Sequence, residues 1–522
     1  IKKYFFTLVY AMSVSRFLAP RCGRIALVSF KQGARKSLPP LTAKIFQAPC
    51  ESIVNCKYST WNTGSLFQRE QLMEKMILLP TSFVIQKARC HSSPNVPLFY
   101  ARERELNNEI LSKNTINDQL EFYQDNKDQT SLVNRITVLH SIAKIAHKYK
   151  AEKEVLQRER EKARNGQESA YFEILDFISE NISSCKAQGL ANIMWALGRT
   201  GDKTHPLVQI CEEEILSHDF SLFHTSEINQ ILTGCASLGM KDSKIFERVQ
   251  ESILNEVIRI SICEARQING ILLAFAKVGR GSSEFFDHIE YEIIQRDFKN
   301  FHNGQIVQFL YTFAMRGVFS DVLFEKAEEE ILRRSSVRLR RKEVVMMLWA
   351  FATAGKGSKG LFETFDKEIV DNRIKDLFTS SLLWIVWSFA TRGMNEGQVF
   401  KAVAEEIYRR GFPQLTNSEI SLCMYSYALS EIPCQRFLKE LAAEVLDRDL
   451  EEFQGDQLSQ VAWACGKEGV INSELFSRLE QEILKCKFSK NHADMIIEGF
   501  CNADMGSEKL FSHLQVMIQQ SV

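Results

Sequence analysis

The densest group of basic side chains in the chain lies between residues 333 and 342. Six of these ten residues are basic: Arg333, Arg334, Arg338, Arg340, Arg341 and Lys342. Clusters of arginine and lysine bind the phosphates of nucleic acids, although a charge run can equally be a solvated loop. We expect a phosphate-binding loop formed by Arg338, Arg340, Arg341 and Lys342. Smaller basic groups stand at similar places further along the chain, at Arg409 and Arg410 and at Lys485, Lys487 and Lys490.

Polar side chains of varying type also recur at regular intervals, namely Ser226, Gln230, Arg266, Gln308 and Gln460. Side chains that change from copy to copy are what proteins that read one RNA base per repeat use. Trp384 is expected to be exposed nearby, where it could stack on a base. The alternative for all of these residues is a solvated face without a ligand.

Residue sets for catalysis, metal binding or nucleotide binding are missing from the sequence. No H-E-x-x-H, G-x-S-x-G or Walker A motif occurs, and the His and Cys residues are dispersed. Residues 355–360 spell G-x-G-x-x-G, but that fingerprint requires a preceding strand, whereas the pattern here predicts a helix. We therefore predict a protein that is not an enzyme and has no cofactor, metal or small-molecule substrate.

A repeat of about 38 residues organises residues 126–522 and must position these side chains. A seven-residue segment reads Trp-Ala-Phe-Ala-Thr-Ala-Gly at 349–355 and Trp-Ser-Phe-Ala-Thr-Arg-Gly at 387–393. Its copies end at residues 201, 239, 279, 317, 355, 393, 431, 469 and 506, mostly in steps of 38. A degenerate tenth copy is expected around 142–146, with a charged helix over 148–164 that lengthens its second half.

Each copy predicts two helices. In the first, apolar residues lie eleven, eight, seven, four and three positions before the terminal glycine, which places them on one helical stripe. In the second helix, an aromatic residue lies seven residues after that glycine and an Ile or Val lies fourteen residues after it, so both face the same neighbour. The glutamate that precedes this Ile or Val is expected on an exposed, acidic side of the helix. Stacked pairs bury apolar surface that one pair cannot. The sequence therefore predicts an all-α, right-handed α-solenoid of about ten 38-residue helix pairs.

Two further expectations follow from the helical wheel of the first helix. Positions thirteen, nine and two before the glycine lie opposite the apolar stripe, so they are expected to line a concave ligand surface. The aromatic residue six before the glycine borders that surface, and we expect it to pack between repeats. This aromatic set is Trp195, Tyr311, Trp349, Trp387, Tyr425, Trp463 and Phe500.

The segment 348–355, Leu-Trp-Ala-Phe-Ala-Thr-Ala-Gly, resembles the core of octotricopeptide and heptatricopeptide repeats. The resemblance spans about residues 130–520, and the pattern is also similar to the helical-repeat subunit of the RNA-editing substrate-binding complex of kinetoplastids. It implies an organellar protein that binds single-stranded RNA in RNA processing, stability, editing or translation. The Pro-rich start of the octotricopeptide unit and a recognisable RAP domain are missing, which weakens a base-per-repeat code.

Residues 1–50 have the composition of an organellar targeting segment. No Asp or Glu precedes Glu51, whereas nine Lys or Arg do, as is typical of a transit peptide; Met12 is the expected initiator. We expect a mitochondrial protein; a plastid is the alternative, because residues 1–15 also resemble a short signal sequence. Residues 51–125 are expected to be a partly disordered linker with some helix near 100–124. No apolar run of about 18 residues predicts a membrane span.

The rest of the chain is net acidic. Without those nine residues, 56 basic residues stand against 65 acidic ones. Because a general polyanion binder is basic overall, RNA binding here must depend on local patches. The alternative is a protein–protein scaffold, such as a subunit of a mitochondrial ribosome or another organellar complex, in which the same surface holds a polypeptide.

Overall fold

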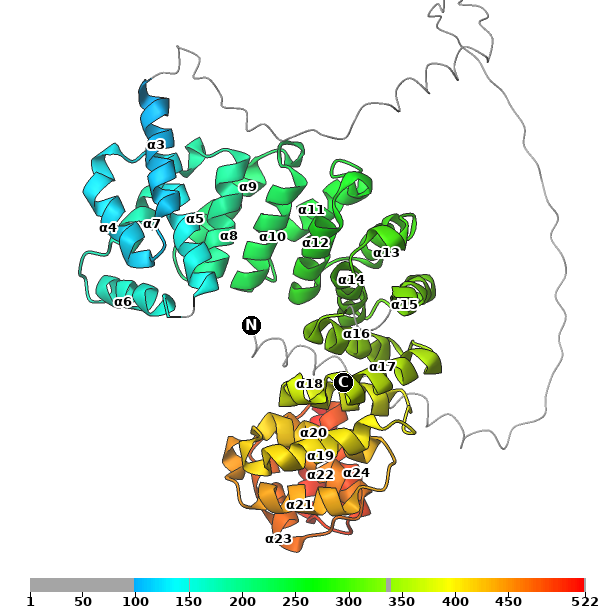
Figure 1. Cartoon of the computed structure of the whole chain (residues 1–522). Coiled ribbons are helices and arrows are strands. Elements are labelled where there is room, and N and C mark those ends of the chain that lie inside the picture. The colour runs from blue at the N-terminus through cyan, green and yellow to red at the C-terminus, as the bar shows by residue number, and fades with distance from the viewer. Residues whose placement is uncertain (1–97, 150, 335–338, 521–522) are drawn as a thin grey trace, which may run out of the picture. The chain divides into compact units, whose positions relative to one another are not determined.

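The computed structural model describes residues 98–149, 151–334 and 339–520. In these residues 23 α-helices follow one another, some joined by short 3-10 helices, and no strand occurs (Figure 1). The predicted targeting segment, most of the predicted linker and Arg338 lie outside the described residues.

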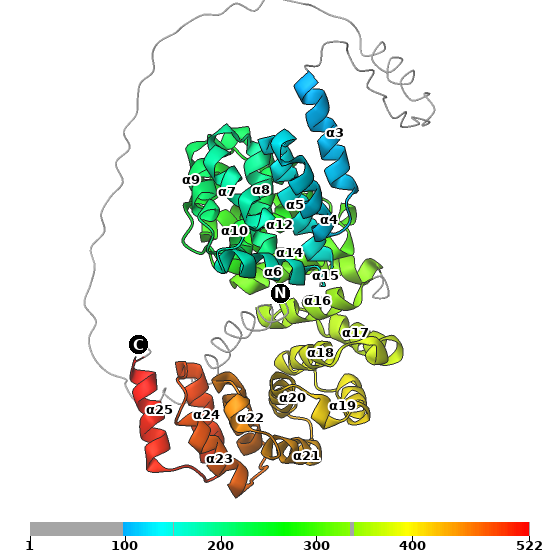
Figure 2. The same ribbon diagram turned by 90° about the vertical axis from the view of Figure 1, so that its left-hand side faces the viewer.

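Ten helix pairs stack in sequence, so that the first helices form one row and the second helices form another (Figure 1 and Figure 2). The first helices are α5 (Leu132–Lys148), α8 (Ala187–Thr200), α10 (Thr225–Leu238), α12 (Ala265–Val278), α14 (Asn303–Arg316), α16 (Arg341–Ala354), α18 (Thr379–Thr391), α20 (Asn417–Leu429), α22 (Gly455–Lys467) and α24 (Lys490–Asn502). The second helices are α7 (Ala170–Asn181), α9 (Leu207–Ser217), α11 (Lys244–Leu254), α13 (Ser283–Ile294), α15 (Asp321–Arg334), α17 (Lys359–Asn372), α19 (Val399–Arg410), α21 (Gln435–Leu446), α23 (Ser473–Ile483) and α25 (Glu508–Gln520). The predicted all-α solenoid of helix pairs is confirmed.

At six junctions between units, an aromatic pair joins the second helix to the first helix of the next unit. Phe324 of α15 meets Phe351 of α16 edge-on, with ring centroids 5.4 Å apart. The same geometry recurs in five other units, between Phe246 and Phe275, Phe286 and Phe313, Phe362 and Phe389, Phe400 and Tyr427, and Phe476 and Phe500. Each edge-to-face pair stabilises the stack by about 0.5–1.5 kcal/mol beyond the area that it buries. The aromatic residue seven positions after the glycine is therefore buried at the junction between units.

A residue in the left-handed conformation ends the first helices from α8 onwards. Gly355 has a φ of 68°, a region that strains side chains other than glycine. In the last pair this residue is Asp504, with a φ of 53°, and not Gly506 as the spacing suggested. Met505 N donates to the Phe500 carbonyl oxygen at 3.0 Å, as Lys356 N donates to that of Phe351 at 2.9 Å. We call the left-handed residue that ends a first helix its cap. Phe500 therefore lies four residues before the cap Asp504, and not six residues before it, where the sequence analysis had placed it.

Three helices lie outside the pair pattern. The helix expected near 100–124 is present as α3 (Leu98–Ser112) and α4 (Ile116–Asn126), and Leu106 and Tyr123 are buried. The packed core therefore begins before residue 126. The charged α6 (Lys153–Arg164) is an insertion and does not lengthen the second helix as expected, because α7 fills that place.

Candidate functional site

The candidate ligand surface is the side of the first helices that carries the positions thirteen, nine and two before the cap; we call it the first-helix surface. Ser226 on α10 and Arg266 on α12 are exposed there, and Gln230 on α10 and Gln308 on α14 are half-buried. The helical wheel placed these four residues correctly, so their side chains are accessible to a ligand on consecutive helices.

Two residues expected on this surface are buried. Trp384 is 5% exposed and Gln460 is 2% exposed, so their predicted accessibility is wrong. The wheel relates a residue to the stripe of its own helix and ignores what packs around it. The ring of Trp384 lies edge-on to Trp387, with centroids 5.5 Å apart. Every residue from 382 to 390 on α18 and from 458 to 466 on α22 is buried.

The aromatic residues six before the cap pack between neighbouring repeats, as expected. Tyr311 and Trp349 on adjacent first helices have ring centroids 5.1 Å apart, and those of Tyr425 and Trp463 are 5.2 Å apart. Tyr311 and Trp349 are 4% and 3% exposed. These rings therefore stabilise the stack and present little surface on which a base could lie.

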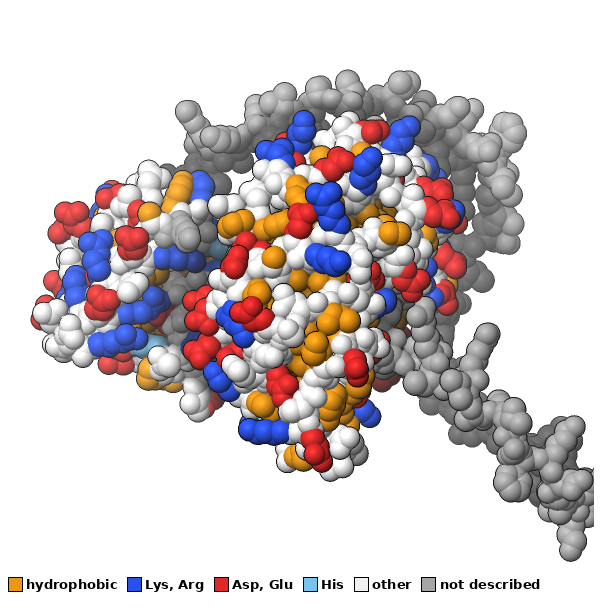
Figure 3. Space-filling view, turned by 90° about the horizontal axis from the view of Figure 1, so that it is seen from below, with side chains coloured by type: hydrophobic (Ala, Val, Ile, Leu, Met, Phe, Trp, Pro, Cys, Tyr) orange, Lys and Arg blue, Asp and Glu red, His pale blue; other side chains and the backbone are white. Residues whose placement is uncertain are grey.

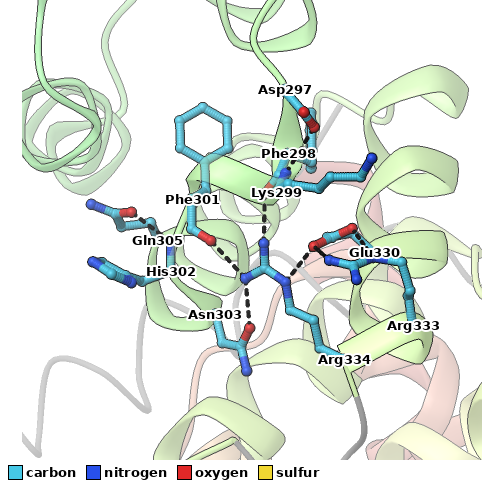
Figure 4. Close-up of polar contacts among 10 residues, drawn as sticks. All are labelled: Asp297, Phe298, Lys299, Phe301, His302, Asn303, Gln305, Glu330, Arg333 and Arg334. Atoms are coloured by element: carbon cyan, nitrogen blue, oxygen red, sulfur yellow. Dashed lines mark hydrogen bonds and ion pairs between the residues drawn. The ribbon is translucent and has the colours of Figure 1, made fainter. Parts of the chain in front are cut away.

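The expected basic cluster at 333–342 divides into two parts with different surroundings. Figure 4 shows that the Arg334 guanidinium reaches into the preceding unit, where it donates to the carbonyl oxygens of Phe298 at 2.7 Å and Phe301 at 2.6 Å. It also donates to Glu330, one turn earlier on α15. Arg333 donates to the same carboxylate at 2.6 and 2.8 Å. Both guanidinium groups are therefore paired with groups of the protein itself, and Arg334 links two units.

This arginine recurs in four units, seventeen residues after the glycine position. Arg296, Arg334, Arg410 and Arg448 each donate to the carbonyl oxygen of the residue 36 positions earlier, which begins a 3-10 helix of the preceding unit. Three of these arginines also pair with the glutamate four residues before them, Glu330, Glu406 and Glu444. The glutamates predicted to form an exposed acidic side are thus largely enclosed: Glu330 is 6% and Glu406 is 5% exposed.

The sequence carried a signal for this contact that the charge-cluster interpretation missed. Glutamate thirteen residues and arginine seventeen residues after the glycine position recur together in four copies. A pair that keeps both its internal spacing and its place in the repeat indicates a contact of the repeat itself. Arg409 and Arg410, interpreted above as a smaller phosphate site, belong to it, and Lys485 likewise pairs with Glu451 and Glu482 at 2.9 Å.

The second part of the cluster faces solvent at the start of α16. The Arg340 side chain is 86% exposed and pairs with Glu343 at 3.0 Å, and the Arg341 side chain is 59% exposed and pairs with Asp376 at 3.4 Å. Lys342 is exposed too. The Arg341–Asp376 pair is exposed on both sides, and such pairs contribute only about 0–1 kcal/mol, so a phosphate could displace Asp376, whereas Glu343 is 13% exposed and also accepts from Arg340 N. The predicted phosphate-binding loop is therefore accessible at its described members.

Cations two residues before the cap add positive charge to the first-helix surface. The Arg199 guanidinium lies 5.2 Å from the centroid of Trp195, and Lys467 Nζ lies 4.8 Å from that of Trp463. Lys277 is exposed at the same position of α12. Over the face seen in Figure 3, basic and acidic side chains are interspersed and neither sign forms one large patch. Any polyanion contact must therefore use local groups.

Other kinds of site find no support in the described part of the chain. His, Cys, Asp and Glu residues form no cluster there that could hold a metal ion, and none of the helices has the length and apolarity needed to cross a membrane. Comparison with protein-family models and with curated proteins finds no match for this chain.

Proposed function

We propose that the chain is an organellar RNA-binding helical-repeat protein, with single-stranded RNA along the first-helix surface from α8 to α16. The observation that carries the proposal is the register of accessible polar groups. Consecutive first helices present Arg199, Gln230, Arg266, Gln308 and Lys342 on one side. Unpaired bases are recognised by such hydrogen-bonding groups and by arginine planes, and phosphates by the cations.

The wider role is drawn from the resemblance of the repeat to organellar RNA proteins. We propose a part in RNA processing, stability, editing or translation in the mitochondrion, with the plastid as the alternative compartment. The acid-free, basic composition of residues 1–50 supports an organellar address.

Crosslinking in purified organelles, followed by sequencing of the RNA bound to the full chain, tests this proposal directly. Discrete RNA sites are expected, and the crosslinked peptides should come from α8 to α16. Crosslinks confined to the second helices, or no RNA above an untagged control, would contradict it.

A protein scaffold is the second candidate, and one observation favours it. Three large apolar side chains are exposed at the ends of adjacent repeat units: Leu222 at 64%, Val257 at 51% and Ile262 at 79%. Apolar side chains exposed together often mark a protein contact. Nuclease treatment separates the two functions, because a scaffold stays in its complex after the RNA is removed, whereas an RNA-tethered protein is released.

A further inference from the structure

Leu222 and Ile262 occupy the same place in two adjacent units, and both depart from the pattern of the repeat. Each is the third residue of a 3-10 helix, η5 (Phe220–Leu222) and η6 (Ile260–Ile262). Leu222 is 64% and Ile262 is 79% exposed. Five other units have an exposed polar residue at this third position, namely Ser184, Asn300, Asp376, Gln414 and Glu452. Packing within the array therefore does not require an apolar side chain here.

A two-residue insertion adds a third exposed apolar side chain at the same place. The link between α11 and η6 spans residues 255–259, whereas the corresponding link after α13 spans residues 295–297. The longer link leaves Val257 51% exposed and holds Glu256 at a φ of 58°, which is uncommon for a residue with a side chain. Glu256 Oε1 lies 3.4 Å from His288 Nε2 on α13, so the turn is tied to the neighbouring second helix. A strained turn that is held in place indicates a functional surface.

Contacts between the two units hold η5 and η6 close to each other. Arg296, near the end of α13, donates to the carbonyl oxygens of Ile260 at 2.6 Å and Cys263 at 2.8 Å, which fixes η6. Cys263 Sγ, directly after η6, lies 3.5 Å from Thr225 Oγ1, in the first turn of α10 just after η5. We call the three exposed apolar residues of this region the apolar edge: Leu222, Val257 and Ile262.

The segment that carries the apolar edge is acidic. Residues 207–297 hold 15 acidic and 8 basic residues. The second helices α9 and α13 contain no Lys or Arg. They contribute seven of the acidic residues, Glu212, Glu213, Glu214, Glu284, Asp287, Glu290 and Glu292. A partner that covers the apolar edge is therefore favoured when it brings positive charge with its apolar side chains.

We propose that the apolar edge is the docking site for a segment of another protein whose apolar side chains are flanked by Lys or Arg. Grouped apolar side chains on a surface mark protein contacts, and the acidic surroundings select the partner. The same charge disfavours the other occupants. A second copy of this chain would bring two acidic segments together, and anionic lipid headgroups or RNA phosphates would be repelled. The inference does not depend on RNA at the first-helix surface, so either proposal can fail alone.

The test is fluorescence anisotropy of the full chain with a labelled amphipathic peptide of about 14 residues, composed of Leu on one helical face and Lys on the other. The variants are Leu222→Asn and Ile262→Asn, because Asn is the residue of the next unit at this position. Each should lower the affinity for the peptide about tenfold or more, since each removes an apolar side chain from the contact. The matched control is Ile471→Asn, which removes a 56% exposed apolar side chain from another unit and should leave the affinity unchanged.

The inference is overturned if the wild type does not bind the Leu–Lys peptide, or if both Asn variants bind it as the wild type does. A second peptide, with Glu in place of every Lys, should not bind. Equal affinity for the two peptides would contradict the selection by charge. Self-association of the wild type in analytical ultracentrifugation that is lost in Ile262→Asn would assign the apolar edge to a second copy of the chain, and would also overturn the inference.

A second measurement uses the wild type alone and keeps the inference falsifiable if the variants fail to fold. Saturating Leu–Lys peptide should slow hydrogen exchange at residues 220–224 and 257–264. Exchange at residues 450–454, the equivalent place around the polar Glu452, should stay the same. Slowed exchange at all three segments would show general binding of the basic peptide to an acidic protein, and no slowing at the first two would rule out contact with the apolar edge.

Discussion

The carboxylate of Glu330 and the guanidinium of Arg334 form an ion pair on α15 that also joins two repeat units. Arg334 donates to Glu330 and, across the unit boundary, to the carbonyl oxygens of Phe298 and Phe301. The Glu330 and Arg334 side chains are 7% and 12% exposed, so water screens the pair little. Removal of one partner of such a pair leaves a buried charge uncompensated, at a cost of about 3–5 kcal/mol.

We expect Arg334→Gln to destabilise the array far more than Arg333→Gln. Both arginines donate to Glu330, but the Arg333 side chain is 55% exposed and makes no hydrogen bond or ion pair with the preceding unit among the described residues. Arg334→Gln should cost about 3 kcal/mol, and Arg333→Gln less than about 1 kcal/mol. Thermal unfolding by circular dichroism, with hydrogen exchange of residues 298–301 as the local probe, measures the difference. Equal shifts for the two variants would contradict a role in joining the units.

The same contact predicts a loss of stability in acid. Hydrogen bonds from Arg333, with Arg334, hold the pKa of Glu330 at about 2, and those from Arg409, with Arg410, do the same for Glu406. The unfolded chain has a glutamate pKa of about 4.3. The stabilisation is therefore complete above that value and is lost as the pH falls towards about 2.

The measurement is the unfolding midpoint as a function of pH for wild type and for Glu330→Gln with Glu406→Gln. The double variant should start lower at pH 7 and converge with the wild type between about pH 4.3 and 2. Curves that stay parallel over this window would show that the two carboxylates do not titrate with depressed pKa values.

Close approach of α8 and α10 should make Gly234 intolerant of a side chain. A Cβ at this position would lie 2.3 Å from the Met194 carbonyl oxygen, a main-chain atom that cannot rotate away. Gly234→Ala should therefore push the two helices apart, at a cost of about 1–3 kcal/mol. Gly360→Ala on α17 is the control, because its nearest neighbour would be Ser358 Oγ at 3.7 Å. That variant should be neutral or slightly stabilising, and a reversed order of stability would contradict the packing.

The periodic part of the fold could be predicted from the sequence because spacing alone determines which residues share a face. Phe324 and Ile331, seven apart, are buried together as the repeat predicts. The end of the first helix in the last unit was predicted wrongly because Asp504, which is not a glycine, adopts the left-handed conformation there. A search for the glycine therefore found Gly506, two residues too late.

The candidate site was harder to predict because exposure depends on neighbouring units. Ser226 and Arg266 lie on the surface as the helical wheel suggested, whereas Trp384 and Gln460 are enclosed. A helical wheel describes one helix alone and takes no account of the helices that pack on either side of it. Charge clusters mislead for a related reason: Arg333, Arg334 and Arg340 are close in sequence, but Arg333 and Arg334 pair with the enclosed Glu330, whereas the Arg340 side chain is 86% exposed.

The phosphate-binding loop gives the last prediction. Replacement of Arg338, Arg340 and Arg341 by Glu should weaken RNA binding and lower the slope of log K against log salt by about 2, with helicity intact. Helicity should survive because the Arg340 and Arg341 side chains are 86% and 59% exposed, so their loss disturbs no packing. The control reverses three exposed charges on second helices, Lys401, Arg436 and Lys439, which changes the net charge equally. If both triple variants lose the same affinity, the effect is one of total charge and the loop has no special role; if neither does, RNA does not contact it.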